Sequence, residues 1–301
     1  MSTIIDVAGL TKWYGKRRGI EEVSFVVSEG ETFGFLGPNG AGKTTTIRVL
    51  LGLLKPTAGR ASIFGLDAWS DAPPIHRRLA FLGSDPGYLG DRSSAAQLDY
   101  LAALRGLERG AWRRMAERLE LDTSVPARKL SRGNRQKIGL VGLFMGREPL
   151  LIMDEPTTGL DPLMQREFLA LVADARAEGK TVFLSSHNLT EVERTCGRVG
   201  IIRDGRLVDI ANVAELLGEH WRSINLVLRE PPPDGVFEIA NVEVIAITGR
   251  EVHLMVRGDV NPLLRRISSL DVVDVAITTP DVEDLFLRYY HGAPAAPVGA
   301  R

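Results

Sequence analysis

Short apolar runs recur along the first two thirds of the chain and predict a buried sheet. Residues 32–36, 150–153 and 181–185 contain no charged side chain, which is typical of strands that are covered on both faces. Helix-like segments lie between them at 44–54 and 95–121, the second rich in Ala, Leu, Arg and Glu. This alternation predicts an α/β fold, a mostly parallel sheet with helices on its faces.

A second, smaller region follows a break near residues 218–221 and a Pro-Pro-Pro-Asp-Gly run at 231–235. Its apolar patterning is typical of a compact mixture of strands and helices. We expect strands at 224–228, 242–247 and 252–256, and helices at 260–270 and 281–290.

Three parts of the chain are therefore expected. The first domain covers residues 1–217, and a small C-terminal α+β domain covers 221–291. Thr279 would cap the last helix, with Pro280 at its first helical position. Residues 292–301 offer nothing to pack and are expected to form a loose tail.

The composition is that of an ordinary folded protein and argues against a nucleic-acid partner. Of 301 residues, 44% are hydrophobic and 25% charged, and the formal net charge is -1. Nucleic-acid binders usually carry a basic excess. The single cysteine, Cys196, excludes an intramolecular disulfide and is expected to be a small apolar filler in a reducing compartment.

No membrane-directed segment is evident. The N-terminal residues lack a basic stretch followed by an apolar core, so no secretory signal is expected. The longest uncharged apolar stretch, residues 138–146, is far short of the roughly 20 residues that a spanning helix needs. If the protein serves a membrane, we expect it to do so through contact with another chain.

A glycine-rich turn after the first apolar run predicts a nucleotide-binding loop. Residues 37–44 read Gly-Pro-Asn-Gly-Ala-Gly-Lys-Thr, the P-loop pattern, between a strand and a helix. Glycine tolerates the backbone angles that turn successive amide groups toward one point, and the following helix adds its positive N-terminal end. Lys43 would bring a full charge to the β- and γ-phosphates, and the Thr44 hydroxyl would ligate Mg²⁺. The motif alone does not say which nucleotide is bound.

Two carboxylates end the second apolar run. Asp154 is placed to reach the Mg²⁺ sphere, because its strand is expected to lie beside the strand of the P-loop. Glu155, one residue on, is placed to face a water in line with the γ-phosphate and to act as a general base. The alternative is a strand that ends on solvated acids, which the neighbouring P-loop makes less attractive.

Further motifs give the sequence its resemblance to a known family. Residues 130–136 read Leu-Ser-Arg-Gly-Asn-Arg-Gln and resemble the signature motif of ATP-binding-cassette (ABC) ATPases. Residues 157–162 resemble their D-loop, residues 185–187 their switch histidine, and Tyr14 the aromatic residue that stacks on adenine. These motifs occur in the family's order over residues 1–217. The resemblance implies a P-loop NTPase fold of the ABC ATPase type, with a helical subdomain.

The same resemblance implies a site shared between two cassettes that face each other head to tail. Ser131 and Gly133 of one chain would close over the γ-phosphate held by the other. His187 would sense that phosphate, and Asp161 would help to form the dimer seam. The implied contacts to ATP come from Tyr14, Gly37, Pro38, Asn39, Gly40, Ala41, Gly42, Lys43, Thr44, Thr45, Ser131 and Gly133.

The chain departs from the family pattern at two places. Its signature holds Arg132 and Asn134 where Gly and Gln are usual, which points to a subfamily. Where many members carry the Q-loop glutamine, this chain offers Ser84 and then Asp85. Ser84 would coordinate Mg²⁺ through water, so that the implied metal set is Thr44, Asp154 and Ser84. Asp85 is the weaker candidate and would cap a turn.

The C-terminal region resembles that of ABC-2 type exporters, and so does the sequence Arg-Gly-Asn-Arg-Gln-Lys at 132–137. The resemblance implies an ATP-hydrolysing subunit with a transmembrane permease as its partner, a second cassette, and a place on the cytoplasmic face of the membrane. A second cassette of the same sequence, a homodimer, is favoured. Alternatively, the C-terminal region is a packing or dimer-stabilising appendage that does not indicate whether the transporter imports or exports its substrate.

Two rival functions remain open. A soluble cassette ATPase acting on ribosomes or DNA would usually fuse two cassettes or carry long basic insertions, and this chain has neither. A regulatory cassette that holds ATP without hydrolysing it would typically have lost Glu155 or His187, and both are present. The transported substrate is not encoded in this chain.

Overall fold

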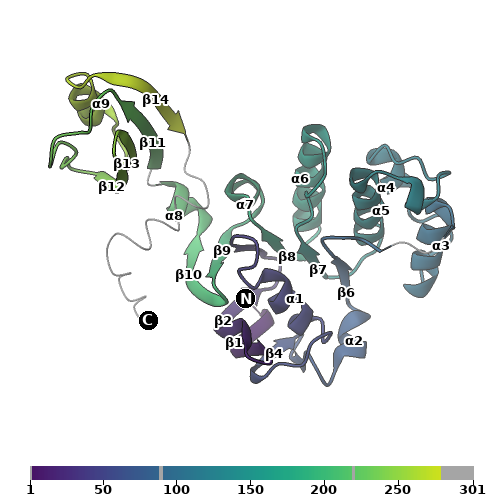
Figure 1. Ribbon diagram of the computed structural model, residues 1–301. Coiled ribbons are helices and arrows are strands. Elements are labelled where there is room, and N and C mark those ends of the chain that lie inside the picture. Colours follow the sequence, from purple (N-terminus) through teal and green to yellow (C-terminus); the bar gives the residue numbers. More distant parts are fainter. Residues whose placement is uncertain (1, 88–90, 219–220, 279–301) are drawn as a thin grey trace. The chain divides into compact units, whose positions relative to one another are not determined.

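The computed structural model describes residues 2–87, 91–218 and 221–278 (Figure 1). The chain divides into two compact units, Met1–Val213 and Ala214–Arg301. The expected boundary at residue 217 falls inside helix α8 (Val213–Gly218). Within the described part of the chain, no helix is long and apolar enough to cross a membrane. The helix expected at 281–290 and the tail at 292–301 lie outside the described residues.

A six-stranded sheet forms the centre of the first unit. Its order is β10-β9-β3-β8-β7-β6, and all neighbours are parallel except the pair β10 and β9. The strands are β3 (Thr32–Leu36), β6 (Leu79–Leu82), β7 (Leu150–Asp154), β8 (Thr181–Ser186), β9 (Arg198–Arg203) and β10 (Arg206–Asn212). Every residue of β3, β7 and β8 is buried. The α/β fold and the three strands predicted from apolar runs are therefore confirmed. The expectation that the strand of Asp154 lies directly beside the P-loop strand was wrong, because β8 lies between β3 and β7.

A second sheet of the first unit was not predicted. It is largely antiparallel in the order β2-β1-β4-β5, with β1 (Thr3–Tyr14), β2 (Arg17–Ser28), β4 (Ala58–Ile63) and β5 (Leu66–Asp67). The pairing of β1 with β2 shifts register at four places. Such bulges interrupt the alternation of buried and exposed residues along β1, so the pattern does not reveal that strand. In β2 the residues alternate regularly from Val23 to Val27, a signal that was not used in the prediction.

Phenylalanines from both sheets form the centre of the core. Phe25 of β2 lies 5.5 Å from Phe33 and 5.8 Å from Phe183, measured between ring centroids. Phe35 lies 5.4 Å from Phe25. All four are almost completely buried, and burial of each such ring contributes roughly 1.5–3 kcal/mol. This packing fixes β3, and with it the start of the P-loop.

Helices cover the sheet and build a separate helical region. Their bounds are α1 (Lys43–Leu50), α2 (Ala72–His76), α3 (Ser94–Leu104), α4 (Arg113–Arg118), the 3-10 helix η1 (Ala127–Lys129), α5 (Arg132–Phe144), α6 (Pro162–Ala177) and α7 (Leu189–Thr195). In Figure 1, α3, α4 and α5 lie together, apart from α1 and the N-terminal strands. They form the helical subdomain that the family resemblance implies.

Two predicted helices are shorter than expected. The single helix predicted over 95–121 was wrong, because the segment forms α3 and α4 with a turn between them. Gly106 and Gly110 occupy that turn at φ of 67° and 82°, a left-handed conformation that ends a helix. The helix predicted over 44–54 is α1, which ends at Leu50 and is followed by Gly52 at φ 64°.

Over residues 221–278 the second unit is a four-stranded antiparallel sheet that packs against helix α9 (Asn261–Ile267). Its order is β12-β13-β11-β14, from β11 (Trp221–Leu228), β12 (Val242–Thr248), β13 (Glu251–Arg257) and β14 (Val272–Thr278). Helix α9 packs Leu263 and Ile267 into the core of this unit. Three strands and this helix were predicted, whereas β14 was missed because its pattern alternates weakly and most of its residues are exposed.

Candidate active site

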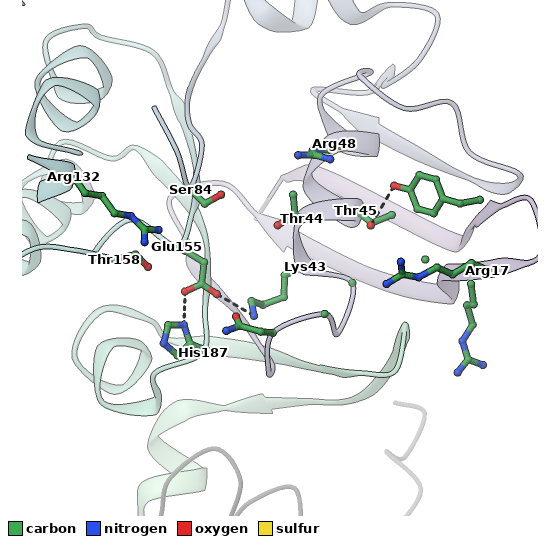
Figure 2. A pocket seen from close by; sticks show the side chains of 16 residues that line it. Arg17, Lys43, Thr44, Thr45, Arg48, Ser84, Arg132, Glu155, Thr158 and His187 are labelled. Atoms are coloured by element: carbon green, nitrogen blue, oxygen red, sulfur yellow. Dashed lines mark hydrogen bonds and ion pairs between the residues drawn. The ribbon is translucent and has the colours of Figure 1, made fainter. Parts of the chain in front are cut away.

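Four neighbouring parallel strands of the central sheet end at one edge, where their following loops meet. β3 leads into the P-loop, β7 ends at Asp154, β8 leads to His187, and β6 leads to Ser84. Ligands of open α/β sheets bind outside the carboxyl ends of the strands. Figure 2 shows the side chains that these loops bring to the pocket.

The P-loop backbone requires glycine at several positions, for its dihedral angles or for close packing. Gly40 and Gly42 have φ of 82° and 111°, the left-handed region that favours glycine. A Cβ atom on Gly42 would lie 2.7 Å from Cγ2 of Ile20, and one on Gly37 would collide with the carbonyl of Ile202. The loop is thus a backbone cradle of the kind that binds phosphate oxygens.

Lys43 is the buried cation of this cradle, with 5% of its side chain exposed. Its Nζ atom donates to the carbonyl oxygens of Gly37 at 2.5 Å and Pro38 at 3.1 Å. The same atom lies 3.0 Å from Oε1 of Glu155. These partners aim the ammonium at the mouth of the cradle, where a phosphate charge would be met.

Glu155 stands at a turn directly after β7. Its φ is 52°, and a left-handed conformation costs a non-glycine residue roughly 1–2 kcal/mol. The turn is held because the Glu155 N–H donates to Ser185, to its carbonyl oxygen at 3.2 Å and its hydroxyl at 3.1 Å. Strain of this kind clusters at functional sites, and here it directs the carboxylate into the pocket.

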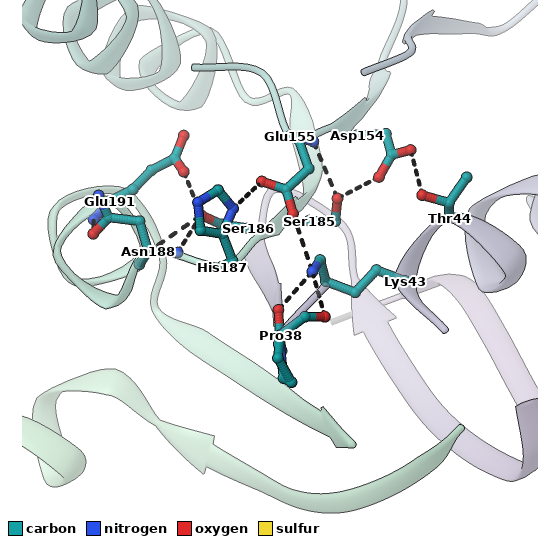
Figure 3. A network of polar contacts seen from close by, with 11 residues as sticks. Pro38, Lys43, Thr44, Asp154, Glu155, Ser185, Ser186, His187, Asn188 and Glu191 are labelled. Carbon is teal, nitrogen blue, oxygen red and sulfur yellow. Dashed lines mark hydrogen bonds and ion pairs between the residues drawn. The ribbon is translucent and has the colours of Figure 1, made fainter. Parts of the chain in front are cut away.

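The Glu155 carboxylate is shared between two partners, as Figure 3 shows. Oε1 pairs with Lys43, and Oε2 lies 2.6 Å from Nδ1 of His187. With Glu155 ionised, Nδ1 carries the proton and donates. Only 14% of the Glu155 side chain is exposed, against 52% for His187. The carboxylate is therefore fixed in orientation at the wall of the pocket.

Asp154 and Thr44 place two oxygen donors side by side. The Thr44 hydroxyl donates to Oδ2 of Asp154 at 2.8 Å, and the Ser185 hydroxyl donates to Oδ1 at 2.6 Å. Asp154 is 2% exposed. A carboxylate and a hydroxyl are the hard oxygen ligands that Mg²⁺ prefers, so the donor set fits this ion.

The pocket has a volume of about 790 Å³ and gathers most of the predicted residues. Tyr14 lies at one side, where its hydroxyl is 3.4 Å from that of Thr45. Ser84 also lines the pocket; its contact with a metal stays a prediction, as does the turn-capping alternative for Asp85. The predicted residues that line the pocket are Tyr14, Asn39, Gly40, Gly42, Lys43, Thr44, Thr45, Ser84, Glu155 and His187.

Sequence reasoning missed a set of arginines around the pocket. Arg17 and Arg18 reach it from the start of β2, Arg48 from α1, and Arg132 from the start of α5. Figure 2 shows Arg132 near Thr158 and Glu155. A signal existed for two of them, because Arg17 and Arg18 closely follow Tyr14 in the sequence. They make the pocket positive, which suits a polyphosphate.

Three predicted residues lie away from the pocket of their own chain and have local roles. Ser131 caps α5, accepting from the Asn134 N–H at 3.3 Å. Asp161 caps α6, accepting from the N–H groups of Leu163 and Met164 at 3.0 Å each. Gly133 approaches so closely that a Cβ on it would lie 2.6 Å from the carbonyl oxygen of Gly159. The signature segment and the D-loop are therefore packed together.

The remaining predicted P-loop residues act from beneath the cradle. Gly37 and Pro38 hold Lys43 through their carbonyls. Ala41 is 3% exposed, and its carbonyl accepts from the Gly205 N–H at 2.9 Å. Together with the strand order and the two acids at the end of β7, Asp154 and Glu155, these features define a P-loop nucleotide-binding protein.

Comparison with known proteins narrows this class. The family model described as ABC transporter matches residues 20–158. The chain is 33% identical over 303 aligned residues to the bacitracin transport ATP-binding protein BcrA of Bacillus licheniformis, covering 97% of this chain and 99% of BcrA. It is 32% identical to the daunorubicin resistance ATP-binding protein DrrA3 of Streptomyces coeruleorubidus, covering 95% of each.

A solved structure supports the same family assignment. An ATP-binding subunit of an ABC transporter superposes with a TM-score of 0.66 at 30% identity, covering 72% of this chain and 93% of that one. The chain belongs to the ABC transporter family, as an ATP-binding subunit that hydrolyses ATP.

Proposed function

We propose that this chain powers export of a small molecule or polymer through a separate transmembrane permease of the ABC-2 type, from the cytoplasmic face of the membrane. The observation that carries this proposal is the extent of the match to BcrA and DrrA3. Both alignments cover at least 95% of this chain, so they include the second unit as well as the cassette. One relative is named for bacitracin transport and the other for daunorubicin resistance, and resistance fits removal of the compound from the cell.

The site geometry supports specific roles in hydrolysis. Lys43 binds the β- and γ-phosphates while the P-loop amides surround them. Glu155 accepts a proton from the attacking water on its carboxylate, which the 2.6 Å contact with His187 holds in place. Tyr14 offers its ring to adenine from the side of the pocket.

A magnesium ion fits beside these groups. Thr44 and Asp154 would hold it, with Ser84 at the pocket wall as the third candidate. When bound, the ion supplies positive charge that stabilises the negative charge developing on the phosphate oxygens. Ser185 fixes the Asp154 carboxylate for that purpose, because its hydroxyl occupies the other oxygen atom.

Two copies of the chain are proposed to share each nucleotide. Ser131 and Gly133 do not line the pocket of their own chain, and they stand at the N-terminus of the 13-residue helix α5. Such a terminus attracts anions, so the pair is available to close over the γ-phosphate of a second cassette. Asp161 lies near this segment, through the contact of Gly133 with Gly159. ATP would join the two cassettes, and hydrolysis would release them.

Co-expression with a permease tests the proposal. The neighbouring reading frames are searched for a permease of the ABC-2 type, the chain is produced together with it, and membranes are washed and solubilised. We expect the two proteins to purify together, and inside-out vesicles to accumulate the transported compound when MgATP is added, with bacitracin and daunorubicin as first probes. A chain that never associates with the membrane protein, or uptake that occurs only in right-side-out vesicles, would contradict export.

A further inference from the structure

A buried carboxylate lies beneath the loop that carries His187. Glu191 belongs to α7 and is 7% exposed. The hydroxyl of Ser186, which is completely buried, donates to Oε2 of Glu191. Figure 3 shows Glu191 next to Ser186 and His187, on the side away from Lys43. Acidic side chains are almost never fully buried unless they are paired or hydrogen-bonded, because burial of the charge costs free energy.

Ser186 connects Glu191 to both halves of the active site. Its carbonyl oxygen accepts from the Gly37 N–H at 3.1 Å, at the entry to the P-loop. Its hydroxyl accepts from the Asn188 N–H at 2.9 Å. The intervening residue, His187, therefore has both of its chain neighbours fixed through one hydroxyl. The 2.6 Å contact of His187 with Glu155 depends on that loop geometry.

Glu191 also faces the segment that follows Glu155. It lines a cavity of about 200 Å³ between the start of α6 and α7, together with Thr157. The side chain of Thr157 stabilises the ionised carboxylate. Oε1 nevertheless has no partner within hydrogen-bonding geometry among the described residues. The carboxylate thus lies between the switch-histidine loop and the first residues of the D-loop.

The surroundings place the ionisation of Glu191 near neutrality. Its pKa is raised to about 7 overall; burial is the largest cause, and the Ser186 and Thr157 side chains act in the opposite direction. The negative charge of Glu155 raises the pKa further, and His187 lowers it. Other charged or titratable groups facing this region are Arg166 of α6 and Arg194 of α7 at the cavity wall, and Cys196, whose own raised pKa reflects burial first and also the charge of Glu191.

We propose that Glu191 is a positioning residue for ATP hydrolysis, which holds the Ser186 hydroxyl and thereby fixes the loop that presents His187 to Glu155. This inference rests on the proposed roles of Glu155 and His187. The observed hydrogen bonds fit the ionised form: Ser186 donates to Glu191 and keeps a lone pair for the Asn188 N–H. A protonated Glu191 would donate to Ser186 and turn its hydrogen toward the Asn188 carbonyl, a longer contact of 3.4 Å.

Two substitutions separate positioning from mere packing. Glu191→Gln keeps an acceptor for Ser186 but cannot ionise, so kcat at pH 8 stays within about threefold of the parent protein. The parent's kcat falls as the pH drops through 7, and the Glu191→Gln profile lacks that fall. Glu191→Leu keeps the volume but removes the acceptor; kcat falls about 10- to 100-fold, because small misplacements of catalytic groups have effects of that size. The KM for MgATP stays within about twofold in both.

Glu193→Gln is the matched control. Glu193 lies on the same helix, and its side chain makes no hydrogen bond or ion pair among the described residues. Burial raises its pKa as well, but it takes no part in the hydrogen bonds of Ser186, so its kcat and pH profile should equal the parent's. Nucleotide binding and thermal unfolding are measured on each variant, and loss of binding in Glu191→Gln would count as a structural role and overturn the proposal. Superimposable pH profiles of parent and Glu191→Gln, or unchanged kcat in Glu191→Leu, would overturn it as well. A parent protein without magnesium-dependent ATPase activity would instead contradict the proposed function itself.

Discussion

The Nζ atom of Lys43 lies 3.0 Å from Oε1 of Glu155, so the proposed phosphate-binding cation and the proposed general base are paired with each other. Only 5% and 14% of these two side chains are exposed, which strengthens their attraction relative to a surface pair. A bound γ-phosphate would compete for Lys43 and release Oε1 toward the attacking water. Nucleotide binding and activation of the proposed base would in this way be linked through a single contact.

Replacing Lys43 tests the cradle. Lys43→Ala removes the charge and leaves the Glu155 carboxylate facing the bound phosphates, so ATP should bind at least about 100-fold more weakly, equivalent to about 2.8 kcal/mol. Titration with a fluorescent ATP analogue measures the affinity. Lys55→Ala, an exposed lysine just beyond α1 that does not line the pocket, serves as the control and should bind like the parent. Equal affinities of Lys43→Ala and the parent would show that Lys43 does not contribute to nucleotide binding.

Replacing Glu155 separates binding from chemistry. Glu155→Gln keeps a hydrogen-bonding group beside His187 but cannot accept a proton, so the hydrolysis rate should fall by roughly 10²- to 10⁴-fold. ATP binding should persist and trap an ATP-bound dimer, which gel filtration with and without ATP would detect. A Glu155→Gln protein that remains monomeric at saturating ATP contradicts the head-to-tail arrangement.

Replacing Ser131 asks whether the signature segment acts on a second chain. Ser131 does not line the pocket of its own chain, so Ser131→Arg should leave ATP binding to the isolated subunit unchanged while it blocks turnover. Steady-state ATPase assays and nucleotide titration give the two readings. Ser124→Arg places the same bulk at an exposed site in the helical region and should remain active. Comparable rates for Ser131→Arg and the parent would exclude the signature motif from the mechanism.

Two glycines of α5 are expected to respond oppositely to alanine. A Cβ on Gly133 would lie 2.6 Å from the Gly159 carbonyl oxygen, whereas one on Gly142 would meet only a Leu101 methyl group at 3.4 Å. Gly133→Ala should therefore destabilise the protein by about 1–3 kcal/mol through overpacking. Gly142→Ala should be neutral or stabilising by up to about 1 kcal/mol. Denaturant unfolding measures the free energy of unfolding of both variants. Equal changes would show that the backbone at Gly159 moves aside for a side chain at position 133 with little cost.

The buried Glu191 predicts how stability depends on pH. Its pKa rises from 4.5 to about 7 on folding, so between these values the folded state holds a proton that the unfolded state has released. The free energy of unfolding therefore falls as the pH rises through this window, by roughly 3 kcal/mol in total at about 1.4 kcal/mol per pKa unit. Glu191→Gln should lose this dependence. Urea unfolding at pH 5 and pH 8 tests it, and an unchanged difference between the two pH values in Glu191→Gln would contradict the assignment.

Local sequence patterns predicted the parts of the fold that depend only on residues close together in the sequence. Strands β3, β7 and β8 are buried on both faces, so each is a continuous apolar run whatever it packs against. The P-loop was equally evident, because the backbone angles that require its glycines are set within a motif of eight residues. The prediction for segment 95–121 was wrong because it relied on the segment's helix-forming composition. Two glycines within the segment end α3 and form the turn before α4.

What the sequence by itself determined was therefore the α/β class, the glycine-rich loop and the carboxylates that end β7. Only the tertiary structure decided that Lys43 pairs with Glu155 112 positions away, that Glu155 meets His187 across 32 positions, and that Arg132 turns toward this same pocket. The physical reason is that strand order, not chain order, sets which loops meet at the sheet edge. A linear pattern reports the burial of each strand, but it does not report which strands are neighbours.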